Sequence, residues 1–396
     1  MNPLNTINPF FELLQVAIGN RTVLSRVLSA TEWEEVYVMC KKQSVTGIAF
    51  AALERLPKEQ LPPGKRIRQW AVKADKIRER NVRLNKECVQ VTRFFEKNGF
   101  TAVILKGQSN YAYYPEWLQG LRTTGDIDVW CWPGRSSRGF RSSRVQEVIE
   151  FCQSKKRGEY VYYHNLDFPI LPTTPIEVHY RPTWLYNPFA NRRLQRWFNQ
   201  FTVYSSQCTV KGFKVVSVEF DVVFQLLHLY KHIFEEGIGL RQLLDYYFVV
   251  KKLNDTQAEP ATKRSQNSLR YGADGSYDTL RDIKAFGLEK FAGAVMYVMQ
   301  EVFAMPREIM LCEPREKDGK LLLEEIMRGG NFGKYDERYN WKETTNGSME
   351  YRGIGYAIAR FRHNARFLFS YPSEVLWEPF FRIYHMLWRR LRLWRY

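Results

Sequence analysis

The stretch LRTTGDIDVW, residues 121–130, carries two carboxylates, Asp126 and Asp128, directly after an Arg-Thr-Thr-Gly turn. Successive side chains on a β-strand point to opposite faces, so the two aspartates are predicted to share one face, about 6–7 Å apart at their Cα atoms. Ile127 and Val129 would then point into the core. Like charges held this close repel each other unless a cation lies between them. The stretch therefore predicts either a solvated strand end or a metal site.

A third carboxylate stands on a later stretch that also predicts a strand. In IEVHY, residues 176–180, Glu177 and His179 are expected to share one face. If this strand is a neighbour of the first acidic strand, three carboxylates converge on one edge of the sheet. Two Mg²⁺ ions roughly 3.5–4 Å apart need such a set of oxygen ligands. We therefore expect Asp126, Asp128 and Glu177 to hold two Mg²⁺ ions.

A sharp turn is predicted shortly before the acidic stretch. TAVIL, residues 101–105, is a short run rich in β-branched residues, and it stops at Lys106-Gly107. Glycine at the end of a strand lets backbone N–H groups approach a phosphate. The turn therefore predicts a backbone surface that is open to an anion.

Sequence texture divides the chain into three segments around these motifs. Residues 1–98 are predicted to be helical, residues 99–216 to form a small mixed sheet with flanking helices, and residues 217–396 to be helical again. Within the last segment, the polar stretch 254–278 predicts a flexible surface loop. Strands are expected at 101–105, 126–132, 160–171 and 175–180, with a hairpin near Lys211-Gly212. The fold class is therefore expected to be α+β.

Local signals predict several of the helices. Thr31 and Glu34 form a capping-box pattern, which predicts a helix start. Apolar residues recur at helical spacing between about Ile67 and Lys97. After Ser217 a second apolar stripe predicts another helix, with Val223, Leu226, Leu227, Tyr230 and Phe234 on one face.

The charge balance favours anionic partners. The chain of 396 residues has a net charge of +17, which suits nucleotides, nucleic acid, an anionic polysaccharide or an acidic membrane face. Solubility alone is the simpler interpretation, and charge does not choose between the two. The 26 Phe, 23 Tyr and 11 Trp residues favour large buried clusters or a broad binding surface.

The cysteines and the hydropathy pattern bear on location. Six cysteines are scattered without a CxxC pair, which argues against a zinc site or a disulfide framework and suits a reducing cytoplasm. The N-terminal stretch lacks the pattern of a signal peptide, and no apolar run approaches the length of a membrane span. We expect a cytoplasmic protein without a transmembrane segment.

These motifs, in their order and spacing, resemble a known family. ILKG, GDIDVW, IEVHYRP, HLYKHIFEEGIGLRQLLD, GGNFG (329–333) and a late YP (371–372) are similar to the bacterial family of uncharacterised nucleotidyltransferases, within the DNA polymerase beta-type superfamily. The resemblance runs from the N-terminal helices almost to the C-terminus. It implies a minimal nucleotidyltransferase fold, with Asp126 and Asp128 as metal ligands and Glu177 as the third carboxylate.

The resemblance also suggests which residues bind the nucleotide. Backbone groups near Gly107 and Ser109, with Lys106 or Arg122, would hold the phosphates of an NTP such as ATP. The superfamily usually has Gly or Ser directly after the first glycine, whereas Gln108 stands there in this chain and Ser109 follows one place later. Further along, the resemblance gives Lys231 and Arg241 a role on the nucleotide side.

Structural alternatives exist for several of these residues. Arg122 could pair with a nearby carboxylate instead of a phosphate, and Arg241 and Asp245, four apart on a helix, are expected to form an ion pair. His228 and His232 are also four apart, but the glutamate that metalloproteases carry after the first histidine is absent. We interpret both histidines as structural or substrate-lining.

The leading functional hypothesis is a Mg²⁺-dependent nucleotidyltransferase. It would move a nucleoside monophosphate from an NTP to a hydroxyl acceptor on a small molecule, glycan, protein or RNA. The alternative is a non-catalytic basic protein that binds nucleic acid or an anionic glycan, although carboxylates on such a face would weaken its binding.

The C-terminal tail supports a further hypothesis. Residues 351–396 hold nine arginines and two glutamates with interleaved aromatic residues. This composition suits peripheral association with the acidic inner surface of a membrane. Packing of the same aromatic residues in the core is the alternative.

Overall fold

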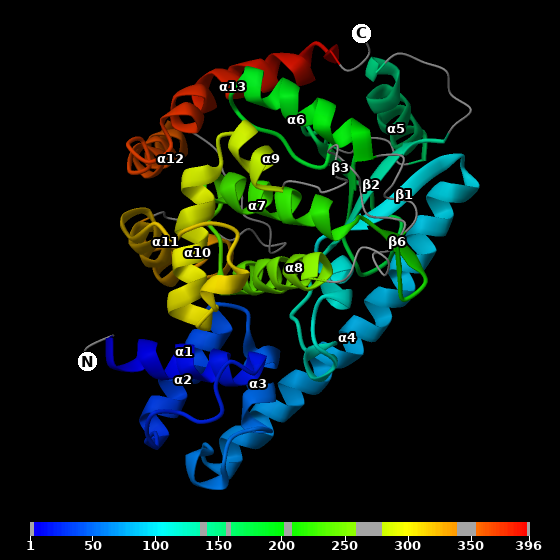
Figure 1. The fold of residues 1–396 in the computed structure, drawn as a ribbon. Coiled ribbons are helices and arrows are strands. Elements are labelled where there is room, and N and C mark those ends of the chain that lie inside the picture. The colour runs from blue at the N-terminus through cyan, green and yellow to red at the C-terminus, as the bar shows by residue number, and fades with distance from the viewer. Residues whose placement is uncertain are drawn as a thin grey trace.

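The computed structural model describes residues 4–134, 141–155, 160–201, 208–258, 279–338 and 354–393. A small sheet lies among helices, with α1 to α3 at one end of the molecule and α12 and α13 toward the other (Figure 1). The expected α+β class, a small mixed sheet with helical N-terminal and C-terminal regions, is confirmed.

Six strands form the sheet in the order β3-β4-β2-β1-β6-β5. β2 pairs antiparallel with β1 and parallel with β4, so the strand that carries Asp128 and the strand that carries Glu177 are direct neighbours. β1 pairs parallel with β6, and the two edge pairs are antiparallel. The strands are β1 (Phe100–Leu105), β2 (Ile127–Pro133), β3 (Asn165–Asp167), β4 (Ile176–His179), β5 (Cys208–Val210) and β6 (Phe213–Val215).

Helices make up most of the rest of the described chain. The N-terminal helices are α1 (Leu4–Ile18), α2 (Ala30–Lys42), α3 (Thr46–Leu53) and α4 (Gly64–Lys97). The middle of the chain forms α5 (Arg141–Lys155), α6 (Pro188–Phe201), α7 (Val218–Glu235) and α8 (Leu240–Ala258). The last helices are α9 (Thr279–Ala285), α10 (Glu289–Phe303), α11 (Glu316–Gly329), α12 (Ile354–Ala365) and α13 (Pro372–Arg390).

Helices cover both faces of the sheet. On one face α5 packs against β1, and the rings of Phe151 and Phe100 have their centroids 4.8 Å apart. On the other face α7 packs against β2, where the rings of Trp130 and Phe220 stack 5.5 Å apart. Because helices cover it on both sides, β2 is buried along its whole length.

The long helix α4 follows a regular apolar pattern. Its core-facing residues recur alternately four and three apart, which keeps one face of a helix toward its neighbours. This confirms the helix predicted up to Lys97, and the structure begins it at Gly64. The buried stripe comprises Trp70, Ala74, Ile77, Asn81, Leu84, Cys88, Val91 and Phe95.

The start of α2 differs from the prediction by two residues. The N-cap is Ser29, whose hydroxyl accepts a hydrogen bond from the backbone N–H of Glu32, and the Ser29 N–H donates to the Glu32 carboxylate at 2.8 Å. The sequence contains two overlapping Ser/Thr-x-x-Glu patterns, and the chain uses the earlier one. The capping box expected at Thr31 and Glu34 is therefore wrong in position.

The strand expected over 160–171 is much shorter in the structure. Only Asn165–Asp167 forms β3, because the chain turns just before it, where the Tyr162 N–H donates to the Asn165 carbonyl. The hairpin near Lys211-Gly212 is confirmed, with both residues at positive φ, +48° and +90°. Two positive φ values are what a tight two-residue hairpin turn requires.

Part of the predicted flexible loop is helical. α8 continues to Ala258, so the first residues of the stretch 254–278 belong to a helix. Residues 259–278 lie outside the described residues.

One hydrophobic core runs through the sheet and the helices on both sides. Side chains of the N-terminal helices donate hydrogen bonds to the C-terminal ones: Gln15 Nε2 to the Val302 carbonyl at 3.1 Å, and Gln43 Nε2 to the Ile326 carbonyl at 2.9 Å. The division of the chain at residues 98 and 216 stays a prediction.

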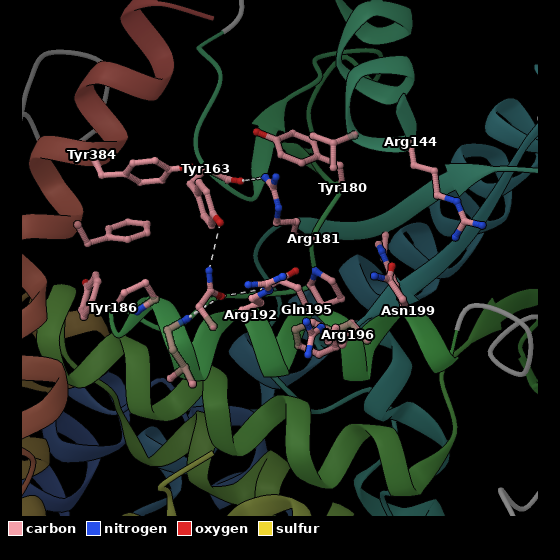
Figure 2. Close-up of a pocket in the computed structure, with 18 of the residues that line it drawn as sticks. Arg144, Tyr163, Tyr180, Arg181, Tyr186, Arg192, Gln195, Arg196, Asn199 and Tyr384 are labelled. Carbon is pink, nitrogen blue, oxygen red and sulfur yellow. Dashed lines mark hydrogen bonds between the residues drawn. The ribbon is translucent and has the colours of Figure 1, made fainter. Parts of the chain in front are cut away.

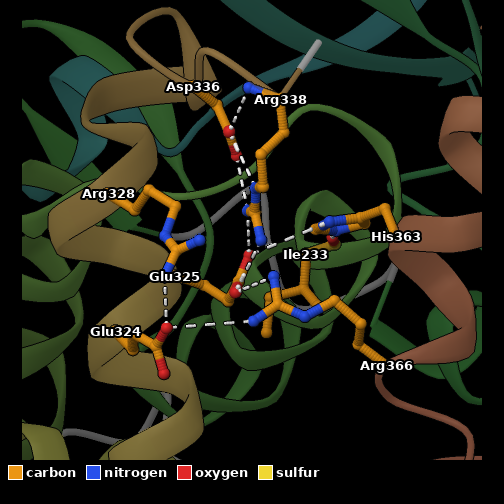
Figure 3. Close-up of polar contacts among 8 residues, drawn as sticks. All are labelled: Ile233, Glu324, Glu325, Arg328, Asp336, Arg338, His363 and Arg366. Atoms are coloured by element: carbon orange, nitrogen blue, oxygen red, sulfur yellow. Dashed lines mark hydrogen bonds and ion pairs between the residues drawn. The ribbon is translucent and has the colours of Figure 1, made fainter.

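A polar network joins the C-terminal helices to each other (Figure 3). Glu325 of α11 accepts hydrogen bonds from Arg338 at 2.6 and 3.3 Å and pairs with Arg366, which follows α12. His363 of α12 lies 2.7 Å from the Ile233 carbonyl of α7. The network holds α12 between α7 and α11.

Candidate metal and nucleotide site

Asp128 and Glu177 meet at the boundary of β2 and β4. They lie directly opposite each other in the parallel register of these strands, so they share a face of the sheet. Asp126 precedes β2 by one residue and is partly exposed, whereas Asp128 is 3% exposed. The two acidic strands are therefore direct neighbours, as expected.

His179 connects the two carboxylates. Its Nε2 atom lies 3.0 Å from Asp128 Oδ1 and 3.5 Å from Glu177 Oε2. One ligand atom from each of these three residues lies within 4.8 Å of the others. His179 is absent from the predicted ligands, although strand alternation places it on the face of Glu177. His179 pairs with Trp130 in the register of β4 and β2, and this register brings its ring to Asp128.

Lys106 supplies the positive charge nearest to Asp128. Its Nζ atom lies 3.1 Å from Asp128 Oδ1. Burial alone would raise the pKa of Asp128, but the Lys106 ammonium and the His179 hydrogen bond outweigh burial and lower that pKa to about 2. For Asp126, burial and then the Asp128 charge raise the pKa. Asp128 is thus held in its ionised form, whereas ionisation of the nearby Asp126 is unfavourable.

The donor set suits a divalent cation. Glu177 is oriented by Asn165, whose amide donates to Glu177 Oε2 at 2.6 Å. Carboxylate oxygens are the ligands that Mg²⁺ prefers, and Asp128 and Glu177 supply them; Asp126, also predicted as a ligand, is not part of this close cluster. The imidazole of His179 adds a nitrogen donor, which suits transition metals better than Mg²⁺. The residues present therefore fit a metal ion.

A small pocket lies beside the carboxylates. Its volume is about 40 Å³, and both Asp126 and Asp128 line it. Four residues predicted to bind the nucleotide line the same pocket: Lys106, Gly107, Arg122 and Arg241. The structure thus brings acidic and basic side chains to one pocket. Ligand pockets usually measure several hundred Å³, so a whole nucleotide would extend beyond this pocket.

The turn after β1 has an unusual backbone. Lys106 has φ +32° and Gly107 has φ +51°. A positive φ is strained for lysine, and such strain gathers at functional sites. No atom of the described residues lies within 4 Å of the position that a Cβ atom would take on Gly107. The backbone at this turn is therefore open on the side where glycine lacks a side chain.

Arg122 is held by a carboxylate in the wall of the pocket. Its Nε and Nη2 atoms donate to the two oxygens of Asp245, each at 2.6 Å, and the Tyr114 hydroxyl donates to Asp245 Oδ1 at 2.7 Å. The expected pair of Arg241 with Asp245 is wrong, because Asp245 is engaged by Arg122, which lies 123 positions earlier in the chain. Of the two interpretations of Arg122, the structure shows the carboxylate pair.

Arg241 lies in the same wall without an acidic partner among the described residues. Its Nη1 atom donates to the Thr123 carbonyl at 3.0 Å, and its Nε atom has no hydrogen-bond partner there. The side chain is buried, and burial followed by the Arg122 charge lowers the pKa of Arg241 to about 10. A buried guanidinium in this state favours an anionic ligand.

Two residues with an expected nucleotide role lie away from this pocket. Ser109 is 1% exposed, and its backbone N–H donates to the Lys106 carbonyl at 2.9 Å. Lys231 pairs with Glu235 at 3.4 Å and lies 2.9 Å from the centroid of the Trp184 ring. Neither is among the residues that line the pocket in the described chain.

The two histidines of α7 are close but differ in position. Their ring centroids are 4.2 Å apart, and His228 lines the pocket while His232 faces Glu236 at 3.8 Å. Burial lowers the pKa of His232 to about 3, so its ring is neutral. His228 therefore lines the pocket, whereas His232 does not.

The GGNFG motif reaches the pocket through Phe332. The Arg241 guanidinium lies 5.3 Å from the centroid of the Phe332 ring. A Cβ atom on Gly333 would fall 2.0 Å from the Glu236 carbonyl oxygen, and one on Gly239 would fall 2.8 Å from the Asn331 Cα atom. Glycines in both segments thus allow two backbones to touch. The glycines in these two segments are the sequence signal of this close backbone contact.

Comparisons with known proteins point to one family. The sequence profile of a family described as "Uncharacterised nucleotidyltransferase" matches residues 29–272. No curated protein matches the chain. Among solved structures, the fold search found the crystal structure of an antigenic nucleotidyltransferase-like protein from Paracoccidioides brasiliensis, with 10% sequence identity and a TM-score of 0.31. That match covers 59% of this chain and 95% of the other.

None of the described helices is long and apolar enough to span a membrane. The family match covers more than half of the chain and includes Asp126, Asp128 of β2, the turn after β1, and Glu177. The chain belongs to the family of uncharacterised nucleotidyltransferases.

Proposed function

We propose that the protein is a Mg²⁺-dependent enzyme that transfers a nucleoside monophosphate from an NTP, such as ATP, to an acceptor hydroxyl. The observation that carries the proposal is one pocket lined by Asp126 and Asp128 together with Lys106, Arg122 and Arg241. Acidic groups hold metal ions, and basic groups hold phosphates. The chemistry is that of the DNA polymerase beta-type superfamily, and a bacterial origin stays a prediction.

The reaction is a displacement at phosphorus. The acceptor oxygen attacks the α-phosphorus of the NTP, the bond to the bridging oxygen of the β-phosphate breaks, and pyrophosphate leaves with that electron pair. The acceptor proton passes to a carboxylate, for which Glu177 is the candidate. Bound Mg²⁺ would neutralise the phosphate charge and stabilise the attacking and leaving oxygens.

The protein's own groups position the NTP. Asp126, Asp128 and Glu177 would hold the metal ions. Arg241 offers its buried guanidinium to the triphosphate, and Arg122 is kept in place by Asp245. The open backbone at Gly107 would approach a phosphate closely. A nucleotide role for Ser109 and Lys231 stays a prediction, because neither lines the pocket in the described chain.

The direct test replaces each aspartate by asparagine. Asp126→Asn and Asp128→Asn keep the side-chain shape but remove an anionic ligand, so transfer from a labelled NTP should fall at least a hundredfold. The assay combines purified protein, Mg²⁺, each labelled NTP in turn and fractionated cell lysate, and follows the label into product.

The matched control is Asp255→Asn, which makes the same change at an exposed site near the end of α8. It should transfer at the unchanged rate. Full transfer by either site variant would show that these aspartates do not hold the catalytic metal.

The alternative function, a passive basic binder of nucleic acid or anionic glycan, predicts a different response to ions. Binding of an NTP to the enzyme should require Mg²⁺, because the bare carboxylates repel the triphosphate. A passive binder should ignore Mg²⁺ and lose affinity steeply with salt, because counterions are released on binding. Calorimetry with an NTP and a mixed-sequence RNA, with and without Mg²⁺ at two salt concentrations, separates the two. Salt-sensitive RNA binding without Mg²⁺-dependent NTP binding would favour the binder.

We also propose a cytoplasmic location with contact to an acidic membrane surface. The exposed side of α13 supports this proposal. It carries an apolar stripe whose residues recur four and three apart and are 43–64% exposed: Leu376, Phe380, Ile383 and Leu387. The two glutamates of this helix are buried, while Arg390 and Arg392 at its end are exposed. Apolar and basic groups without exposed acids suit an anionic lipid surface.

A further inference from the structure

A large cavity among the described residues lies next to the carboxylates of β2 and β4 but is separate from the nucleotide pocket. Its volume is about 680 Å³, within the range of small-molecule sites. Figure 2 shows it between α6, α13 and the start of α5, beyond the ends of β2 and β4.

The cavity carries positive charge without compensation. Four arginines line it: Arg144, Arg181, Arg192 and Arg196. No Asp or Glu is among the described residues that line it. In the described part of the chain, Arg144, Arg192 and Arg196 form no ion pair, so their charges are available to a ligand. Guanidinium groups match the geometry of phosphate oxygens.

One of the arginines is held in place by the protein. Arg181 Nη1 donates to the Tyr163 carbonyl at 2.5 Å, and its guanidinium lies 4.4 Å from the centroid of the Tyr163 ring. The Tyr163 hydroxyl in turn accepts a hydrogen bond from the Asn191 amide of α6 at 3.1 Å. Fixed donors lose less freedom when they bind a ligand.

Aromatic walls complete the cavity. The lining includes Trp130 and Trp132 of β2, whose ring centroids are 4.6 Å apart, and Phe381 and Tyr384 of α13. Flat faces of this kind suit a ring. Gln195 adds an amide that is oriented by the Thr183 carbonyl at 2.8 Å. The lining therefore matches a ring compound that carries an anionic group.

The cavity adjoins the metal cluster along the same two strands. Trp130 of its wall lies opposite His179 in the register of β2 and β4, and it follows Asp128 by two residues. Arg181 follows His179 by two residues. Two residues of strand span about 7 Å, so a ligand in the cavity has one end near the carboxylates.

We propose that this cavity binds the acceptor of the transfer reaction and that the acceptor is a phosphomonoester carried on a ring compound. The role as acceptor site rests on the proposed function, whereas the binding itself does not. Sugar phosphates and nucleoside monophosphates share this chemistry. The free hydroxyl of such a compound would point toward Asp128 and Glu177, and its phosphate would contact the arginines.

Binding is tested by calorimetry on the full chain in the Asp128→Asn background, where turnover is blocked. The probes are a hexose phosphate, a nucleoside monophosphate, the unphosphorylated hexose and nucleoside, and inorganic phosphate. We expect one of the two phosphomonoesters to bind at least tenfold more tightly than its unphosphorylated form and than inorganic phosphate. Which of them does so identifies the source of the ring.

The test variant and its control change arginines on different faces of α6. Arg192→Gln with Arg196→Gln should weaken this binding at least tenfold, while Arg193→Gln, an exposed residue of the same helix outside the cavity lining, should leave it unchanged. Circular dichroism checks that all three variants fold.

The proposal is overturned if no phosphomonoester binds, if inorganic phosphate binds equally well, or if the double variant binds as tightly as the parent. Failure of the proposed function looks different: the phosphomonoester binds through Arg192 and Arg196, but the wild-type chain transfers no label from any NTP to it.

Discussion

Asp128 is the residue on which the site depends most. Lys106 and His179 both lie within 3.1 Å of its Oδ1 atom, and together they keep it ionised in a buried place. A metal ion would take over the role of these two cations. A metal ion bound to Asp128 would compete with the Lys106 ammonium for this carboxylate. The position of Lys106 would therefore depend on metal binding.

Sequence alone predicts which side chains share a strand face, because alternation is a local property. It therefore placed Asp126 with Asp128, and Glu177 with His179. The contact of His179 with Asp128 depends on the register between β2 and β4, which neither strand specifies by itself. The pair of Arg122 with Asp245 likewise depends on how α8 packs against the turn before β2.

A buried carboxyl group outside the site gives a prediction on pH. Asp221 is fully buried in the first turn of α7, and its Oδ2 atom accepts a hydrogen bond from the Tyr113 hydroxyl at 2.8 Å. Burial raises the pKa of Asp221 to about 7. The folded state therefore holds a proton that the unfolded state releases near its ordinary pKa. The stability from this group is present at low pH and is lost as the pH rises toward 7.

Asp221→Asn should remove this loss, because the amide stays neutral. Relative to the wild type, the variant should gain stability between about pH 4 and pH 8, on the order of 2–4 kcal/mol from the raised pKa. Urea unfolding at several pH values measures the difference. A constant difference between the two proteins across this range would show that Asp221 does not titrate as proposed.

At the scale of elements, the long strongly periodic segments could be predicted and the short ones could not. α4 and α7 have many apolar positions at helical spacing, so single exceptions do not change the pattern. β3 has three residues and forms because β4 offers it an edge. The start of α2 was ambiguous between two capping boxes, and packing rather than sequence selected the one at Ser29.

The attachment of α12 provides a prediction at this scale. Glu325 is 9% exposed at its side chain and serves both Arg338 and Arg366 (Figure 3). Glu325→Gln removes the charge that these two guanidinium groups share, so the free energy of unfolding should fall by about 1–3 kcal/mol. Thermal or urea unfolding measures the change.

The control for this variant lies one residue earlier. Glu324 is 53% exposed at its side chain; it pairs with Arg328 on the surface of α11 and makes only a long contact, 4.0 Å, with Arg366. Glu324→Gln should cost less than about 0.5 kcal/mol, because exposed ion pairs contribute little. Equal losses in both variants would mean that the network does not anchor α12.

At the scale of the whole molecule, the exposed apolar surface is unevenly distributed. The four largest exposed fractions of hydrophobic side chains in the described chain are Phe369 at 91%, Phe189 at 72%, Phe361 at 65% and Phe380 at 64%, and all but Phe189 lie in the C-terminal region. Patches of this kind mark interaction sites. The stripe on α13 defined by Leu376, Phe380, Ile383 and Leu387 also borders the large cavity at Phe380. Membrane contact would therefore bring the mouth of the cavity close to the lipid surface.

The last prediction concerns this stripe. Leu376→Gln, Ile383→Gln and Leu387→Gln combined should reduce partitioning onto vesicles with anionic lipid at least tenfold, because each apolar side chain that enters the interface contributes about 1 kcal/mol or more. Wild-type binding should weaken with salt and be low on neutral vesicles, because arginines at the end of α13 attract the anionic headgroups. Three exposed valines elsewhere, Val38, Val72 and Val82, serve as the control when changed to Gln, and that variant should bind as the wild type does. Co-sedimentation with vesicles measures the bound fraction, and analytical ultracentrifugation measures self-association. If the stripe variant lost a dimer in solution while its vesicle binding stayed unchanged, the stripe would be an interface between copies of the chain and not a membrane contact.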